Sequence, residues 1–162
     1  MSNLPYSEGT WFAVPLTDAG YGIGVVARMA RRGGNVFGYF FGPRRSRVPT
    51  LRDLPNYEPK DGVLVCQFSD LNLVEGAWPI IGEQESWRRA DWPMPAFGWH
   101  DTSAGVYRAV RHAEDNPGNP ISWTIVSREE YEALPRDHSY SQGAVEIVLT
   151  KRLGGAWPAP PR

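Results

Sequence analysis

Residues Gly20 to Val26 read GYGIGVV, with a glycine at every second position. A phosphate-binding loop needs a strand before such glycines and a helix after them, because the helix N-terminus holds the phosphate. Here the β-forming residues continue to Met29, the pair Gly33-Gly34 ends the run, and neither GxGxxG nor GxxxxGK[ST] occurs. We therefore interpret the stretch as a strand whose bare face lets the sheet coil or an aromatic ring lie across it. The rings expected there are Tyr39, Phe41 or a neighbouring tryptophan.

The flanking segments predict three consecutive antiparallel strands, over residues 11–16, 21–29 and 36–41, because turn clusters of Asp, Gly and Asn separate these β-forming runs. Four more strands are expected at 62–68, 106–111, 121–126 and 143–151, and an apolar strand carrying Trp78 after an acidic loop. Residues 91–99 and 116–120 are expected to be loops.

Helical segments are expected to be few. Thr50 to Leu54 predicts one capped helical turn, and residues 83–90 another. Ser127 to Glu130 is a capping box that opens a helix over 128–134, which Pro135 stops. The predicted fold class is α+β, mainly β, with a curled antiparallel sheet or a small barrel-like core and one or two short helices. Residues 1–153 are expected to form one domain, and residues 154–162 a flexible Gly/Pro-rich tail.

Composition indicates a globular protein of one domain, since 162 residues with 41% hydrophobic and 22% charged side chains can bury a core. No apolar run approaches the ~20 residues that span a bilayer, and the N-terminus lacks the basic start and apolar core of a secretory signal. The sequence has a single cysteine, Cys66, which is typical of a protein in a reducing compartment. We expect its side chain to be buried and to pack like a small apolar residue. We therefore expect a cytoplasmic protein that makes no membrane contact.

Residues with recognisable catalytic or metal-binding spacing are missing from the sequence. His100, His112 and His138 are scattered, with no i, i+4 pair and no CxxC, and no GxSxG or SxxK occurs. We therefore predict no catalytic residues, no metal, no cofactor and no enzymatic activity.

Charge is distributed unevenly along the chain, although its net value is only −1. Residues 19–52 contain seven arginines and no acid, whereas residues 53–87 contain seven acids and one lysine. Clustered charge steers partners, although charge runs most often are solvated surface. The partner-binding residues that we predict are five arginines in turn-like segments together with one aromatic residue, namely Arg31, Arg32, Arg44, Arg45, Arg47 and Trp99.

Two segments resemble a known family. Residues 9–16 (GTWFAVPL) followed by 21–26 (YGIGVV), and residues 68–82 (FSDLNLVEGAWPIIG), are similar to the immunity protein 26 family of bacterial polymorphic toxin systems. The resemblance covers roughly residues 9–150 and rests on short structural motifs. It implies a β-rich cytoplasmic protein that neutralises a cognate protein toxin by binding it, and it supplies no catalytic residues. The basic segment 31–47 and the Pro-rich tail depart from the family pattern.

The sequence therefore supports two hypotheses about function, which belong to different classes. The first is a non-catalytic immunity protein. The alternative is a small β-barrel nucleic-acid-binding protein or ribonuclease, since such proteins also begin with strand–turn–strand. Mixed charge and scarce lysine near the tryptophans make nucleic acid the less favoured partner. The oligomeric state is left open by the sequence.

Overall fold

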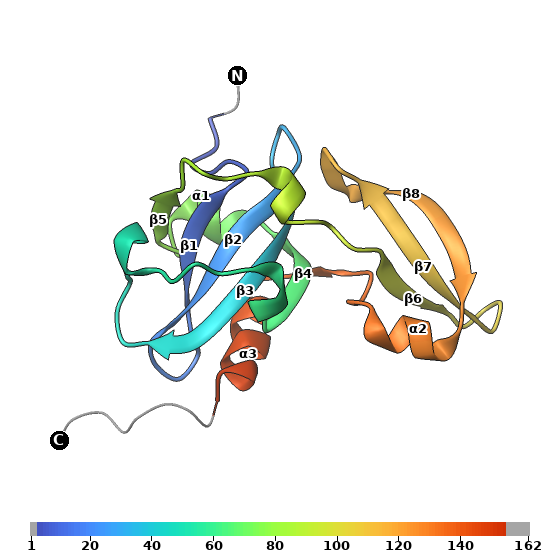
Figure 1. Cartoon of the computed structure of the whole chain (residues 1–162). Helices are drawn as coiled ribbons and strands as arrows, with labels where there is room; N and C mark the ends of the chain where they lie inside the picture. Colours follow the sequence, from blue (N-terminus) through green and yellow to red (C-terminus); the bar gives the residue numbers. More distant parts are fainter. Residues whose placement is uncertain (1–2, 155–162) are drawn as a thin grey trace.

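The structure, a computed structural model, describes residues 3–154 of the chain. A sheet of six strands forms its larger part, in the order β5-β1-β2-β3-β4-β9 (Figure 1). Neighbouring strands are antiparallel except for β4 and β9, which are parallel. The strands are β1 (Thr10–Pro15), β2 (Tyr21–Met29), β3 (Asn35–Arg45), β4 (Leu64–Ser69), β5 (Ile80–Glu83) and β9 (Ser139–Tyr140).

A second, smaller sheet lies to one side of the first and consists of an antiparallel meander in the order β6-β7-β8 (Figure 1). Its strands are β6 (Phe97–Asp101), β7 (Val106–Ala113) and β8 (Asn116–Val126). The helix α2 (Arg128–Ala133) covers one face of this sheet, where the Tyr131 ring lies 4.7 Å from the Tyr107 ring. The other helices are α1 (Leu71–Glu75) and α3 (Gln142–Arg152), and three short 3-10 turns are η1 (Leu51–Asp53), η2 (Pro59–Asp61) and η3 (Arg89–Asp91).

Both faces of the large sheet are buried, which explains why its central strands read as nearly continuous apolar runs. On one face, α3 packs Val145 and Leu149 against Phe12 and Phe40. On the other face, the segment between β5 and β6 places Trp92 and other apolar residues over the strands. The core residues of this second face are Trp11, Ile23, Val25, Ala27, Phe37, Tyr39, Phe41, Trp92, Met94 and Phe97. Because Phe97 belongs to β6, the small sheet shares this core.

The alternating glycines of β2 lie against the α3 face. A Cβ built on Gly24 would lie 2.4 Å from Phe12 Cζ, and one on Gly22 would lie 2.6 Å from Leu149 Cδ2. These distances are too short for a real contact, so a side chain at either position would force Phe12 or Leu149 to shift. The sequence interpretation of a strand with a bare face is confirmed, but the groups that fill it are Phe12 and Leu149 rather than Tyr39 or Phe41.

The fold class is confirmed as α+β, mainly β, with a curled antiparallel sheet. The three N-terminal strands, the strands near 62–68, 106–111 and 121–126, the capped turn at Thr50 and the helix after Ser127 all lie where the sequence predicts them. No closed barrel forms within residues 3–154, since the two sheets stay separate.

Several local predictions are wrong. Residues 143–151 form the helix α3 instead of a strand, because Ser141 caps it by accepting a bond from Ala144 N and the buried side chains Val145 and Leu149 are four residues apart. The predicted loop at 116–120 is the first half of β8, and part of the predicted loop at 91–99 belongs to β6. Trp78 precedes β5 and is buried, and the acidic segment before it contains α1. Residues 155–162, most of the predicted tail, lie outside the described part of the chain.

Candidate functional site

The arginines predicted to form one binding surface are divided between two ends of the large sheet. Arg31 and Arg32 are exposed in the turn between β2 and β3, whereas the other three follow or end β3. Because β3 contains 11 residues, the two groups are separated by roughly 33 Å at about 3.3 Å per residue. The five arginines therefore cannot contact one small partner surface together.

Arg44 is a structural residue rather than a surface contact. Its side chain is 2% exposed and makes an ion pair with Asp18. The same guanidinium donates to the carbonyl oxygens of Ala19 at 3.2 Å and Thr150 at 3.5 Å, so it ties the end of β3 to α3 and to the first turn. The hydrogen bond from Arg44 lowers the pKa of the Asp18 carboxyl. Arg44 is therefore held in the packing of the sheet and presents little surface to a partner.

Arg45 and Arg47 remain available at the surface. Arg45 is half-buried and donates to the Tyr57 hydroxyl at 3.3 Å, and that hydroxyl donates to the Gly42 carbonyl at 3.0 Å. Arg47 is exposed, and a surface hollow of about 790 Å³ extends from Pro43 to Asp53 beside both residues. Arg52 is exposed in η1 close by. We call the group Arg45, Arg47 and Arg52 the basic end.

The basic end contains one acid, Asp53, which is engaged locally. Asp53 accepts hydrogen bonds from the Thr50 hydroxyl at 3.0 Å and the Thr50 amide at 3.4 Å, as the box around Thr50 predicts. These bonds, with smaller contributions from Arg47 and Arg45, lower the pKa of the Asp53 carboxyl. Within residues 3–154, Arg45, Arg47 and Arg52 make no ion pair, so their charge is directed to solvent or to a partner.

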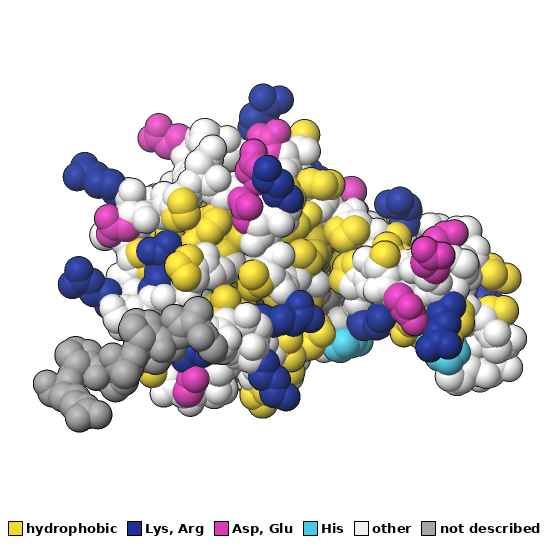
Figure 2. All heavy atoms as spheres, turned by 60° about the horizontal axis from the view of Figure 1, so that its bottom comes forward, with side chains coloured by type: hydrophobic (Ala, Val, Ile, Leu, Met, Phe, Trp, Pro, Cys, Tyr) yellow, Lys and Arg dark blue, Asp and Glu magenta, His cyan; other side chains and the backbone are white. Residues whose placement is uncertain are grey.

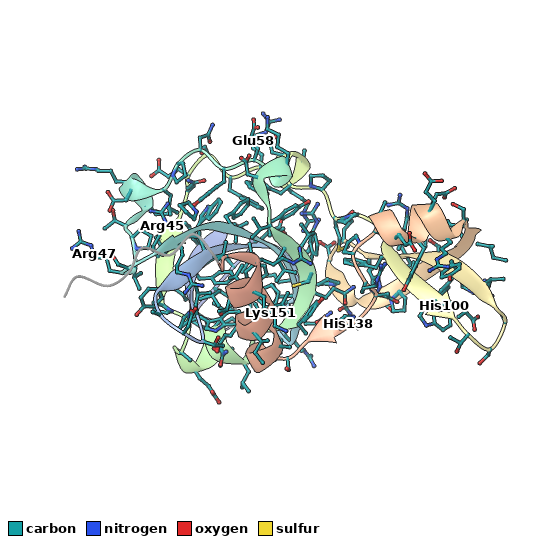
Figure 3. All side chains as sticks on the ribbon, turned by 90° about the horizontal axis from the view of Figure 1, so that it is seen from below. Arg45, Arg47, Glu58, His100, His138 and Lys151 are labelled. Carbon is teal, nitrogen blue, oxygen red and sulfur yellow. The ribbon has the colours of Figure 1, made fainter. Side chains whose placement is uncertain are left out.

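Trp99, the predicted aromatic contact, lies far from the basic end. Figure 3 shows Arg45 and Arg47 at one end of the molecule and His100, the neighbour of Trp99 in β6, at the other end. Trp99 is 41% exposed and sits in a strand of the small sheet rather than in a Pro-rich loop. The prediction that Trp99 stands beside the arginines is therefore wrong.

The small sheet carries an apolar face that the sequence reasoning missed. Trp99 and Ile125 are both paired with Arg108, and Trp123 is paired with Val110, so their side chains share the face opposite α2. Ile121 lies two residues before Trp123, at the position where the β7–β8 register shifts, and it is exposed beside this row. The exposed fractions are 59% for Ile121, 51% for Trp123 and 62% for Ile125. The alternation of Ile, Trp and Ile in residues 121–125 is the signal that could have identified this face.

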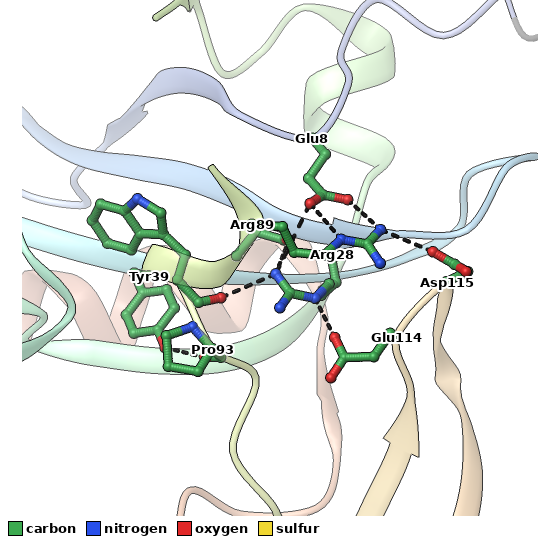
Figure 4. Close-up of polar contacts among 9 residues, drawn as sticks. Glu8, Arg28, Tyr39, Arg89, Pro93, Glu114 and Asp115 are labelled. Carbon is green, nitrogen blue, oxygen red and sulfur yellow. Dashed lines mark hydrogen bonds and ion pairs between the residues drawn. The ribbon is translucent and has the colours of Figure 1, made fainter. Parts of the chain in front are cut away.

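A charge network centred on the buried Arg28 links the two sheets (Figure 4). The Arg28 side chain in β2 is 4% exposed, makes an ion pair with Glu114 in the β7–β8 turn, and donates to the carbonyl of Trp92 at 3.0 Å. Arg89 in η3 donates to both oxygens of Glu8, at 2.8 and 2.7 Å, and to Asp115 at 2.8 Å. The hydrogen bonds that Arg89 donates to Glu8, and then the one to Asp115, raise the pKa of Arg89. The network fixes the β7–β8 turn against the large sheet, which is a structural role.

The groups that could carry chemistry are held in structural positions. The Cys66 thiol is 1% exposed, and burial raises its pKa, so it stays protonated. His112 is buried with Nε2 at 2.7 Å from Asp137 Oδ1, which joins β7 to the segment after α2. In the part of the chain that the structure describes, no three His, Cys, Asp or Glu side chains are placed to hold a metal ion. Two further hollows border η2, one of about 640 Å³ beside Tyr57, Trp87 and Trp92 and one of about 610 Å³ beside Val65 and Arg136.

Charge on the surface is mixed rather than concentrated. On the face drawn in Figure 2, lysine and arginine side chains are spread around the rim with acidic side chains between them. No helix within residues 3–154 has the length and apolar character needed to cross a membrane. The described residues on the face drawn in Figure 2 form no continuous basic groove of the kind that follows a nucleic-acid backbone.

Comparison with known families gives a match. The model of the family described as immunity protein 26 matches residues 7–107, which is more than half of the chain. The matched region contains β1 to β5, α1 and β6, and it ends inside β7. Of the charge network, it includes Glu8, Arg28 and Arg89. The strand β8 and the helices α2 and α3 lie beyond it. Comparison with curated proteins and with solved structures gives no match.

Proposed function

Because the chain belongs to the immunity protein 26 family, we propose that it neutralises a cognate bacterial protein toxin by binding it. The family match is the observation that carries this proposal. The proposed mechanism is stoichiometric capture with no chemical step, and the cytoplasm is the proposed compartment, where the toxin of the producing cell would be met.

We place the toxin contact at the basic end. Arg45 and Arg47 line a hollow and Arg52 is exposed close by, and none of the three is engaged in an ion pair within the described residues. Guanidinium groups pair with carboxylates in a bidentate geometry at a lower desolvation cost than ammonium groups. An acidic surface on the toxin is therefore the complementary partner. Arg31 and Arg32, at the other end of β3, form a separate exposed pair that serves as an internal comparison.

The test uses the toxin encoded beside the gene for this protein. The purified full-length protein is titrated with that toxin by calorimetry, and cells that express the toxin are tested for survival with and without the protein. We expect a stoichiometric complex and rescue of growth. Absence of a complex at micromolar concentrations, together with unprotected cells at normal protein levels, would refute the proposal.

A nucleic-acid role would use the same basic end, so it needs its own control. Labelled RNA and DNA are incubated with the protein at low micromolar concentration in low and high salt. Phosphate binding produces a shift that weakens steeply as salt rises. We expect no salt-dependent shift, because the net charge is −1 and the charged face in Figure 2 is mixed.

A further inference from the structure

The strand β8 exposes an apolar row with no covering element among the described residues. Ile121, Trp123 and Ile125 are each at least half exposed, and α2 covers the opposite face of the same sheet. Together they leave on the order of 400 Å² of apolar side chain in contact with water, which reaches the size of the largest patch on a typical monomer. A row of this size indicates a contact surface.

The same strand is also an edge. In the order β6-β7-β8, β8 has a neighbour on one side only within residues 3–154. Pro117 and Pro120 lack an amide hydrogen and protect its first half from pairing. Residues 121–126 (ISWTIV) contain no proline, glycine or charged residue. Natural edge strands rarely leave such a segment open, because it is a template for another strand.

The residues around Trp123 read nearly the same in both directions. Ile121 and Ile125 lie two positions before and after Trp123. The hydroxyl residues Ser122 and Thr124 lie one position before and after it. In an antiparallel pair with a two-fold axis at Trp123, Ile121 faces Ile125 of the second copy and Ser122 faces Thr124 of the second copy. The apolar residues then meet on one face and the hydroxyl residues on the other, and both are favourable cross-strand pairs. A foreign strand would not require this symmetry.

We propose that two copies of this chain associate through their β8 strands, so that two three-stranded sheets form one continuous sheet of six strands. The contact is isologous, as two-fold dimers require. No charged residue occurs in β8, so the pairing brings no like charges together. Pairing of the strand edges covers the flanks of the apolar rows but not their outward surface, so the buried area falls below the value of about 1,200 Å² for standard specific interfaces, in the range of weak and transient contacts. A reversible dimer that forms at micromolar concentration is therefore expected, and it does not depend on the proposed toxin-binding function.

The first experiment measures the mass of the full-length protein by sedimentation velocity from about 1 to about 200 μM, the range in which an interface of this size associates. We expect a monomer–dimer equilibrium. Trp123→Lys should weaken dimerisation at least about tenfold, because it places two like charges at the two-fold axis. An equal mixture of the Trp123→Lys and Trp123→Glu proteins should form a heterodimer. Ile147→Lys, at a half-exposed isoleucine on α3, is the matched control and should dimerise as the unmodified protein does.

A second pair of variants tests the register. The double substitution Ile121→Lys with Ile125→Glu places opposite charges against each other twice in the dimer, whereas Ile121→Lys with Ile125→Lys places like charges there. Both lose the same two apolar residues from exposed positions, so both should fold. We expect a dimer from the first variant and a monomer from the second, with circular dichroism spectra unchanged.

Three results would overturn the proposal. The first is a monomer at every concentration, and the second is a dimer that Trp123→Lys does not weaken. The third is a monomeric protein whose toxin binding is abolished by Trp123→Lys, which would assign the apolar row to the toxin instead. A dimer that forms without any toxin binding would support the pairing and count against the proposed function alone.

Discussion

The ring of Phe12 occupies the space that a side chain on Gly24 would need. The two residues are direct partners across β1 and β2, and a Cβ on Gly24 would lie 2.4 Å from Phe12 Cζ and 3.1 Å from Phe40 Cδ1. An aromatic residue that covers a cross-strand glycine protects the bare backbone and permits tight curvature. This pair explains why the glycine-rich strand belongs to a packed sheet rather than to a nucleotide site.

Replacing Gly24 with alanine should therefore destabilise the protein. The added methyl group must displace two buried rings, so we expect the free energy of unfolding to fall by about 1–3 kcal/mol, as measured by urea denaturation. Gly143→Ala is the control, because Gly143 lies in α3 and its Cβ would meet nothing within 4 Å. That substitution should raise the free energy of unfolding by about 0.5–1 kcal/mol. A Gly24→Ala protein as stable as the unmodified protein would contradict this account of the packing.

Replacement of Arg28, whose guanidinium is buried, should also lower the free energy of unfolding. Arg28→Met removes the ion pair with Glu114, whose side chain is 55% exposed, and the hydrogen bond to the Trp92 carbonyl. Water screens the exposed carboxylate, so we expect the lost hydrogen bonds to lower the free energy of unfolding by about 1–3 kcal/mol. Arg52→Met, at an exposed position, should change it by less than about 0.5 kcal/mol. Equal effects of the two substitutions would show that the network does not hold the sheets together.

Alkaline pH should destabilise the protein through Tyr39. Burial raises the pKa of the Tyr39 hydroxyl to about 12, although the charge of Arg28 opposes this. The unfolded chain releases this proton near pH 10, so the folded state binds the proton more tightly. The stability contribution is therefore complete below about pH 10 and is lost as pH rises towards about 12, by on the order of 2–3 kcal/mol.

The variant Tyr39→Phe separates this effect from other alkaline titrations. At pH 8 it should lose about 1 kcal/mol, because the hydroxyl no longer donates to the Pro93 carbonyl. Between pH 10 and 11.5 its free energy of unfolding should fall less steeply than that of the unmodified protein. Urea denaturation at several pH values measures both slopes, and identical slopes would exclude Tyr39 as the group responsible.

The sequence predicted the N-terminal strands well because their signal is local, in the turns and the β-forming runs. The helix α3 was mistaken for a strand because Val145, Ile147 and Leu149 alternate, while the helical spacing of Val145 and Leu149 was overlooked. What stabilises the helix is tertiary contact, since Leu149 and Leu153 fill the space over Gly22 and Gly42. A window of ten residues carries no information about glycines more than a hundred positions away.

The candidate site was predicted only in part, for a similar reason. Arg44 and Arg45 are neighbours in sequence, yet one is buried against Asp18 and the other lies at the surface. Adjacent strand residues point to opposite faces, so charge clustering along the chain does not produce one basic surface. Trp99 illustrates the same limit, because it belongs to β6, and Figure 3 shows His100 of that strand at the opposite end of the molecule from Arg47.

The last prediction concerns the basic end and tests the proposed toxin contact directly. Arg45→Ala with Arg47→Ala removes two charges that no ion pair engages within the described residues. If an acidic toxin surface meets this end, the association rate should fall about tenfold at low salt, because long-range attraction accelerates encounter. The remaining rate should then depend little on salt, as stopped-flow mixing with the toxin can measure.

Arg31→Ala with Arg32→Ala is the matched control, since it removes the same charge from the opposite end of β3. The two double variants have the same net charge as each other. An effect of overall charge would therefore slow the association of both variants with the toxin to the same degree. A selective loss in the Arg45 and Arg47 variant would place the toxin at the basic end, because only local charge distinguishes the two proteins. Equal rates for both variants, or full protection of cells by the Arg45 and Arg47 variant at normal protein levels, would move the contact to another surface.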